Sequence, residues 1–377
     1  MTSIPFIDLQ AQRRRLGPAL ERAILDAVEG GQWVMGPQVA ALEKELAAFA
    51  GVKHAIACAN GTDALMIVLR AWDIGPGDAV FVPAFTFAAS AEVVALVGAA
   101  PVFVDVREDT FNMSPESLKE AIALVRREGK LVPRAIMPVD LFGQSADYPA
   151  LEEIARAEKL RMLCDTAQAF GATLDGRSTA SFGDAAATSF FPAKPLGCFG
   201  DGGATFTHDD ALADLLRSIR IHGQGSDKYE NVRIGVNSRL DTIQAAVLLE
   251  KMKIFPDEIE ARERIARRYS KALGASNRIR VPHVEKGAQS TWAQYTIQVP
   301  DRDRVKAELA AKGIPTQVYY PIPLSRQKGY AQFPSAPIPV SEKLSHSVLA
   351  LPMHPYLDDA TQDRIVEAVL ESVARSA

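Results

Sequence analysis

The chain is poor in cysteine and has no long apolar run. Its 377 residues include three cysteines, Cys58, Cys164 and Cys198, which are too few and too scattered for a disulfide framework or a zinc site. No apolar run is long enough to cross a membrane, and the first residues lack the basic and then apolar pattern of a secretory signal. We therefore expect a cytoplasmic protein with no bound metal and no membrane partner.

A block of charge of one sign is also lacking. The 42 Lys and Arg nearly balance the 46 Asp and Glu, which gives a formal net charge of -4. We expect no nucleic-acid partner, because a nucleic-acid-binding arm would need a basic run. The chain is 47% hydrophobic and 23% charged, which is typical of a soluble globular protein with a sizeable core. Its length is enough for two domains.

From His54 onward, apolar segments of strand length alternate with amphipathic segments of helical length. The strands are predicted at 54–59, 79–83, 101–106, 135–141, 161–165, 185–191 and 203–207. Because these segments are apolar throughout, they predict an α/β protein with a mostly parallel, seven-stranded sheet covered on both faces. Right-handed crossovers place the loops after the strands along one edge, where ligands bind in open α/β sheets.

The regions flanking the sheet are mainly helical. Two helices, 16–28 and 39–49, precede the first strand, and we expect them to pack outside the sheet. Further helices at 240–255 and 258–273 lead to a second region. That region is predicted as strand 293–299, helix 302–311, strand 316–320, and helices 341–349 and 360–375. We therefore predict a large domain at 1–255 and a smaller C-terminal α+β domain at 256–377, with the proline-containing loop 320–339 as a lid or rim.

One lysine, Lys194, lies between an apolar segment and a glycine-rich turn. A lysine in apolar surroundings loses its charge more easily, and a neutral amine is a nucleophile. Such an amine suits Schiff-base chemistry with an aldehyde cofactor. From this stretch alone, a lysine that extends to solvent is the favoured interpretation, so the other motifs must decide.

Two other segments contain groups that could bind phosphate. Gly61 and Thr62 open a helix directly after a strand, where exposed amides and a hydroxyl form an anion site. The alternative is an ordinary N-cap. Ser189, five residues before Lys194, could add a second hydroxyl, and the alternative for it is a hydrogen bond within the loop.

Three further segments contain groups suited to a planar cofactor and an anionic ligand. Asp165 ends an apolar strand, so its carboxylate could keep a pyridinium nitrogen protonated, or it could cap a helix. Phe87 follows another strand and could stack on a ring, although core packing is the commoner role. Asn237 and Arg239 lie in a glycine-containing loop, where the guanidinium could grip a phosphate or carboxylate or stabilise the loop. Together, these independent signals indicate one cofactor.

These motifs resemble those of the DegT/DnrJ/EryC1/StrS sugar aminotransferases, fold-type I enzymes that use pyridoxal 5'-phosphate. The resemblance extends over nearly the full length of the chain. The matching motifs are Asn60 to Leu65, Pro83 to Phe87, Asp165 to Gln168, Ser189 to Gly203, and Gly235 to Asp241. The resemblance implies the fold-type I architecture and a pyridoxal phosphate site.

The resemblance implies roles around the cofactor ring. Lys194 would bond covalently to the cofactor and move the proton between substrate carbon and cofactor. Asp165 would pair with the pyridine nitrogen. Gln168 would bond the ring hydroxyl oxygen, and Phe87 would stack on the ring.

The resemblance also implies how the cofactor phosphate is held. Gly61, Thr62 and Ser189 would bind it from the same chain. Asn237 would reach it from the partner subunit, which implies a homodimer with shared active sites.

The motifs are similar to those of enzymes that aminate the 3-keto group of a UDP-linked 2-acetamido uronic acid, with L-glutamate as donor, for surface polysaccharide such as lipopolysaccharide O-antigen. In that case Arg239 is the candidate for binding a carboxylate of glutamate or of the sugar, and Tyr320 for binding the substrate. Tyr319 and Ser325 stand where many family members have histidine, which leaves the sugar open.

Three alternatives remain. One is a 4-keto-6-deoxy sugar aminotransferase of the perosamine type. Another is a regulatory relative that holds the cofactor without turnover. An unrelated nucleotide-binding α/β protein is disfavoured, because no Gly-x-Gly-x-x-Gly turn follows the first strand. Lys194 argues against the dehydratase branch of the family, which has histidine in its place.

Overall fold

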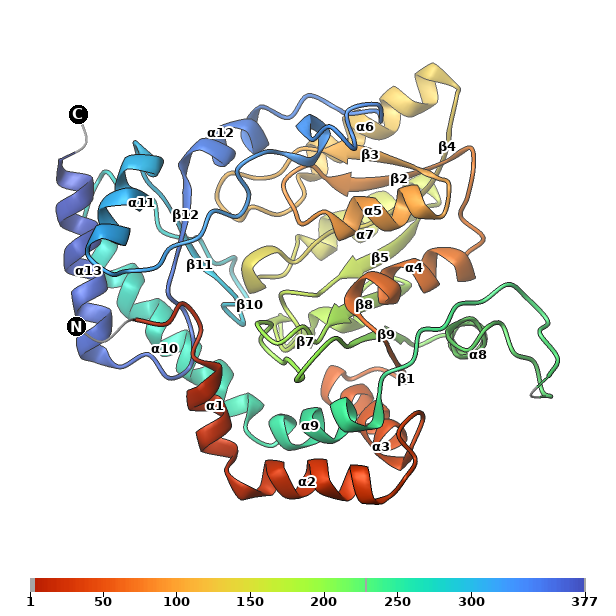
Figure 1. Cartoon of the computed structure of the whole chain (residues 1–377). Coiled ribbons are helices and arrows are strands. Elements are labelled where there is room, and N and C mark those ends of the chain that lie inside the picture. The colour runs from red at the N-terminus through yellow and green to blue at the C-terminus, as the bar shows by residue number, and fades with distance from the viewer. Residues whose placement is uncertain (1–3, 228, 376–377) are drawn as a thin grey trace.

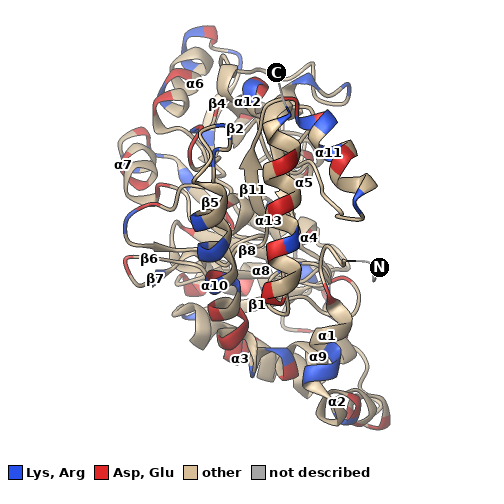
Figure 2. Ribbon diagram, turned by 90° about the vertical axis from the view of Figure 1, so that its left-hand side faces the viewer, with Lys and Arg blue, Asp and Glu red and all other residues tan. Residues whose placement is uncertain are grey.

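The computed structural model describes residues 4–227 and 229–375. A large sheet lies between two layers of helices, and the C-terminal elements gather to one side of it, on the left in Figure 1. Basic and acidic residues both occur along helices such as α11 (Arg302–Ala311), as Figure 2 shows. Within the described residues, no helix combines the length and apolar character needed to cross a bilayer.

The large sheet has seven strands in the order β1-β9-β8-β5-β4-β2-β3. β9 runs antiparallel to both of its neighbours, and the other pairs are parallel. The strands are, in chain order, β1 (His54–Cys58), β2 (Asp78–Pro83), β3 (Ala100–Val104), β4 (Val132–Ile136), β5 (Arg161–Asp165), β8 (Ala185–Ser189) and β9 (Gly203–Thr207). This topology confirms the predicted mostly parallel, seven-stranded α/β fold.

Helices cover both faces because successive side chains of each strand point to opposite sides. In β2, Phe81 belongs to one buried cluster, whereas Val80 and Val82 belong to the other. The helices contributing to the first cluster are α3 (Pro37–Ala50), α6 (Pro115–Glu128), α7 (Tyr148–Glu158), α9 (Thr242–Met252) and the start of α10 (Phe255–Leu273). Those contributing to the second are α4 (Gly61–Ala71), α5 (Ala89–Leu96) and α8 (Asp210–Arg220).

The N-terminal region forms three helices rather than the predicted two: α1 (Leu9–Leu16), α2 (Pro18–Glu29) and α3. As expected, α2 lies outside the sheet, where it packs on α9. The expectation was wrong for α3, which contacts β1 directly. Its apolar side chains Val39, Leu42 and Leu46 are fully buried in the main core, so this helix is part of the sheet's covering layer.

The C-terminal region has a hydrophobic cluster of its own, which also includes Ile4 from the N-terminus. Its elements are α10 (Phe255–Leu273), β11 (Tyr295–Gln298), α11 (Arg302–Ala311), α12 (Pro339–Ser347), β12 (Val348–Leu351) and α13 (Asp359–Ala374). The division into domains 1–255 and 256–377 stays a prediction, supported by this separate cluster and by the start of α10 at Phe255.

Two predictions in this region were wrong. Residues 316–320 form no strand, and Gln317 makes an isolated bridge to Ala350 instead. Residues 348 and 349, predicted as helix, begin β12, which pairs antiparallel with β11. Both errors have one cause, because the partner of β11 comes from a segment far along the chain that local patterns do not reveal.

A small sheet and three short helical turns were not predicted, because each element has only two or three residues. They are β6 (Thr173–Leu174), β7 (Arg177–Ser178), β10 (Ala288–Gln289), and the 3-10 turns η1 (Leu141–Gly143), η2 (Thr179–Ser181) and η3 (Leu324–Arg326). β10 pairs with β6, so the segment after α10 crosses back onto the large-sheet region.

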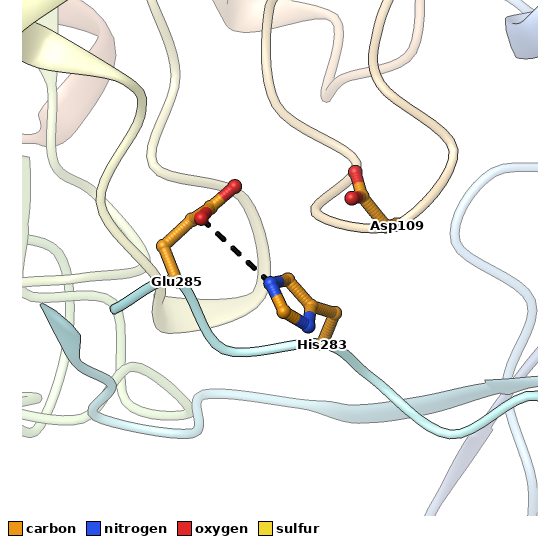
Figure 3. A group of neighbouring side chains, drawn as sticks. All are labelled: Asp109, His283 and Glu285. Carbon is orange, nitrogen blue, oxygen red and sulfur yellow. Dashed lines mark ion pairs between the residues drawn. The ribbon is translucent and has the colours of Figure 1, made fainter. Parts of the chain in front are cut away.

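An ion-pair cluster fastens this crossing segment. Figure 3 shows Asp109, from the loop after β3, facing His283 and Glu285 of the segment before β10. One side-chain oxygen or nitrogen atom of each of these residues lies within 4.8 Å of those of the other two, close enough to bind a metal ion. However, Nη2 of Arg107 lies 3.2 Å from the Asp109 carboxylate and 2.8 Å from that of Glu285. The Gln144 amide donates to the His283 carbonyl at 2.9 Å and accepts from the Glu285 N–H at 2.8 Å. We interpret the group as a clamp, since Arg107 already pairs with both carboxylates.

The proline-containing loop covers the outer edge of β3. Phe103 donates its N–H to the Pro334 carbonyl at 3.0 Å and accepts from the Ala336 N–H at 2.9 Å. Leu324 N–H donates to the Ala84 carbonyl at 2.8 Å. These bonds satisfy an otherwise open strand edge, and they anchor the loop whose first residue, Tyr320, reaches the pocket described next.

Candidate active site

A cavity of about 610 Å³ lies at the carboxyl ends of the central strands. Eight predicted site residues line it together: Gly61, Thr62, Phe87, Asp165, Gln168, Ser189, Lys194 and Tyr320. Asn237 and Arg239 are not in its lining. The position agrees with the crevice expected at the carboxyl edge of an open α/β sheet.

Asp165 occupies the last position of β5 and is 5% exposed. Its Oδ2 accepts from the Ser90 hydroxyl at 2.8 Å, and its Oδ1 accepts from the Ala167 N–H at 3.1 Å. Burial raises the pKa of the Asp165 carboxyl, while these two hydrogen bonds and the charge of Lys194 oppose the rise. The carboxylate is therefore held in place and keeps accepting capacity for a ligand.

Lys194 lies in a tight loop between β8 and β9. Its N–H donates to the Phe191 carbonyl at 2.8 Å, so the loop turns back just before the lysine. Desolvation lowers the pKa of the Lys194 amine, and the charge of Asp165 opposes the shift. Although the residue is half-buried because the pocket opens around it, loss of hydration dominates, and the amine is neutral more often than a surface lysine.

Helix α9 supports this loop through a lysine that was not singled out from the sequence. Lys251 is 1% exposed, and its amine donates to the Gly197 carbonyl at 2.5 Å. Burial lowers the pKa of Lys251 to about 8. A Cβ at Gly197 would lie 2.6 Å from the Phe191 and Pro192 carbonyl oxygens, so the loop closes with almost no free space.

The N-terminus of α4 forms a cradle opposite β8. The Asn60 side chain caps the helix by accepting from the Asp63 N–H at 2.8 Å, which leaves the amides of Gly61 and Thr62 for a ligand. A Cβ at Gly61 would lie 2.6 Å from Cβ of Ser189. Only glycine therefore lets the helix N-terminus approach the serine this closely. The N-cap of α4 is therefore Asn60, not Thr62 as the alternative interpretation of this segment would require, and the threonine hydroxyl is not used as the cap.

Gln168 links the pocket to the C-terminal region. Its Oε1 accepts from the Phe142 N–H at 2.8 Å, and its Nε2 donates to the Tyr320 hydroxyl at 3.2 Å. Burial raises the pKa of Tyr320 well above its usual value, so the phenol stays protonated. The Tyr320 ring lies 6.5 Å from that of Phe87, which is 57% exposed. Phe87 thus presents a free ring face at the pocket.

Several lining residues were not predicted individually. Asn60, Thr86, Phe191 and Asp201 belong to motifs noted above, whereas Ile7 and Gln294 gave no separate signal. Ser90 carried no signal of its own either, although its place in the first turn of a helix after β2 brings it to the pocket edge. Tyr319 also lines the cavity, but Ser325 does not and is buried in η3.

Asn237 and Arg239 lie away from this chain's own pocket, in the segment before α9. The Arg239 Nε donates to Asn237 Oδ1 at 2.9 Å. Asn237 is exposed and pairs through its backbone with Ile221. The structure therefore does not bring these two predicted residues to the other eight.

A lysine that is readily neutral, a fixed carboxylate and a helix N-terminus share one crevice, an arrangement that suits an enzyme of the Schiff-base class. The chain belongs to the DegT/DnrJ/EryC1/StrS aminotransferase family, whose profile matches residues 16–370.

Individual relatives agree with this assignment. The chain is 47% identical to a UDP-2-acetamido-2-deoxy-3-oxo-D-glucuronate aminotransferase of Pseudomonas aeruginosa, over 95% of this chain and 97% of the relative. It is 40% identical to a UDP-N-acetyl-3-dehydro-alpha-D-glucosamine 3-aminotransferase of Acidithiobacillus ferrooxidans, over 98% and 97%. A crystal structure of a family member from Brucella abortus matches with a TM-score of 0.97 and 54% identity, over 99% and 100%.

Proposed function

We propose that this protein transfers the amino group of L-glutamate to the C3 keto group of a UDP-linked 2-acetamido-2-deoxy-3-oxo uronic acid, with pyridoxal 5'-phosphate as cofactor. The single observation that supports this best is the meeting of Lys194 and Asp165 in one cavity. Such a reaction would supply an amino sugar for surface polysaccharide, including O-antigen.

The pocket residues fit this cofactor. The cradle of Gly61, Thr62 and Ser189 would hold the phosphate, because a side chain at position 61 would fill it. Asp165 would accept from the ring nitrogen, and Gln168 would bond the ring hydroxyl oxygen. Their protein hydrogen bonds are already made, so binding needs little rearrangement.

The cofactor, when bound, supplies an aldehyde that takes up the amine nitrogen and a ring that spreads the electron pair left on the substrate carbon. Lys194 Nζ removes the proton from the amine-bearing carbon of glutamate and, in the second half-reaction, returns one to the sugar carbon. Its depressed pKa favours the neutral amine that can accept this proton. Asp165 stays ionised beside the ring, because Ser90 and Ala167 donate to it.

The choice of sugar is supported by the two 3-keto sugar relatives. Tyr320, fixed by Gln168, and Tyr319 face the cavity and are the candidates for substrate contact. Arg239 is the candidate for a carboxylate of glutamate or of the uronic acid.

We further propose that two chains form a homodimer and share their active sites. Asn237 and Arg239 are absent from their own pocket, as residues that serve the partner's site would be. Exposed apolar side chains near this segment are suited to being covered: Trp33, Val34, Phe199, Val232 and Ile234.

The experiment is a pair of half-reactions. Glutamate should convert the bound aldehyde form to the amine form, with a shift in the visible absorption band. The amine-form enzyme should then return to the aldehyde form with the UDP-3-keto uronate and much more slowly with 4-keto-6-deoxy sugar nucleotides. Preference for the 4-keto sugars would replace our substrate with the perosamine-type alternative. No response to glutamate would favour the regulatory alternative.

A further inference from the structure

A buried serine supports the carboxylate of Asp165 from helix α5. Ser90 is 1% exposed and donates its hydroxyl to Asp165 Oδ2 at 2.8 Å. The Thr86 hydroxyl lies 3.5 Å from the Ser90 oxygen. Because the Ala167 N–H holds the other carboxylate oxygen, each oxygen has one protein donor and one direction left for a ligand.

We propose that Ser90 is a positioning residue, which fixes the Asp165 carboxylate toward the cofactor ring nitrogen and preserves it as an acceptor. This inference rests on the proposed function. The hydroxyl acts through Asp165 alone, since Ser90 is not itself part of the cavity lining.

The burial of Asp165 makes this support necessary. Burial is the largest influence on its pKa and raises it, and the Ser90 hydrogen bond is the largest influence in the opposite direction. Lys194 helps to keep the group ionised. Burial raises the pKa of Asp140, which follows the neighbouring strand, and of Tyr320, and the charge of Asp165 adds to both rises. Without the hydroxyl, Asp165 therefore takes up a proton at higher pH and competes with the ring nitrogen for it.

Pyridoxamine phosphate is a suitable probe, because it has no aldehyde and cannot bond covalently to Lys194. We expect Ser90→Ala to weaken its binding about ten-fold, as for a hydrogen bond to a charged group. As the pH is lowered, the affinity of the variant for pyridoxamine phosphate should begin to fall at a higher pH than the affinity of the wild type. Ser345→Ala removes another buried serine hydroxyl, one that donates to the Glu342 carbonyl, and should bind the probe as the wild type does.

A double-mutant cycle separates positioning from general packing. In an Asp165→Ala background, Ser90→Ala should change binding less than about two-fold, because its target is gone. If Ser90→Ala does not fold, Ser90→Cys, with a weaker donor of similar size, should give a smaller loss in the same cycle. Wild-type affinity and an unchanged pH profile in the folded variant would overturn the inference, as would an equal loss in both backgrounds. Failure of the wild type to bind the probe would instead refute the proposed function.

Discussion

Lys194 keeps its amine beside a fixed carboxylate, in a pocket that strips much of its hydration. Replacing it by alanine should abolish conversion of the bound cofactor by glutamate, because no other amine lines the cavity among the described residues. Stopped-flow absorbance measures this step directly. Lys119→Ala, an exposed residue of α6, is the matched control and should convert the cofactor at the wild-type rate. A Lys194→Ala enzyme that still converts it would contradict the role.

Asp140 shows how burial couples pH to stability at a single residue. Its carboxyl is fully buried and accepts from the Tyr148 hydroxyl and the Ala146 N–H, and burial raises its pKa to about 8. The folded state thus binds a proton that the unfolded state loses near pH 4. The stabilisation of the folded state by this proton is full below about pH 4 and is lost as the pH rises toward 8.

Asp140→Asn should remove this dependence. Between pH 5 and pH 7, the free energy of unfolding of the variant relative to the wild type should rise by up to about 1.4 kcal/mol per pH unit. Urea denaturation at several pH values measures the difference. A constant difference across this range would mean that Asp140 is ionised in the folded protein.

Helix α4 places its N-terminus against β8 because residue 61 has no side chain. Gly61→Ala should push the helix away from Ser189. The amides of the helix N-terminus and the Ser189 hydroxyl would then be too far apart to bind one phosphate, and pyridoxal phosphate binding should weaken by at least about ten-fold. Pyridoxal, which lacks the phosphate, should lose much less affinity. Gly329→Ala adds the same methyl group where it meets no atom within 4 Å, and it should leave both affinities unchanged. Equal losses for the two ligands would show a general disruption rather than a damaged cradle.

At the scale of elements, the central sheet could be predicted because its strands are continuous apolar runs with clear helices between them. Lys194, Asp165 and Gly61 were found because each follows a strand at the same edge. Other features depend on contacts that no local pattern contains. The pairing of β11 with β12 is one, and the Ser90 hydrogen bond across 75 residues is another. The burial of α3 against β1 was also missed, because helical periodicity predicts which face of a helix is apolar but not which element that face packs on.

The whole molecule leaves Asn237 and Arg239 outside their own pocket, which the proposed dimer explains. If Asn237 serves the partner's site, mixed dimers of Lys194→Ala and Asn237→Ala chains contain one site with both residues intact. Re-equilibrated equimolar mixtures should then regain about a quarter of wild-type activity, since half of the dimers are mixed and one site in each works. Activity no higher than the mean of the two parent variants would place Asn237 and Lys194 in the same chain's site.

The most direct test of the central claim is to trap the cofactor and find the residue that holds it. Purified protein loaded with pyridoxal phosphate is reduced with borohydride, digested and mapped by mass spectrometry. The account predicts one pyridoxyl group, on Lys194, and bleaching of the visible band. An adduct on another lysine, or no adduct while the protein is folded and saturated, would contradict it.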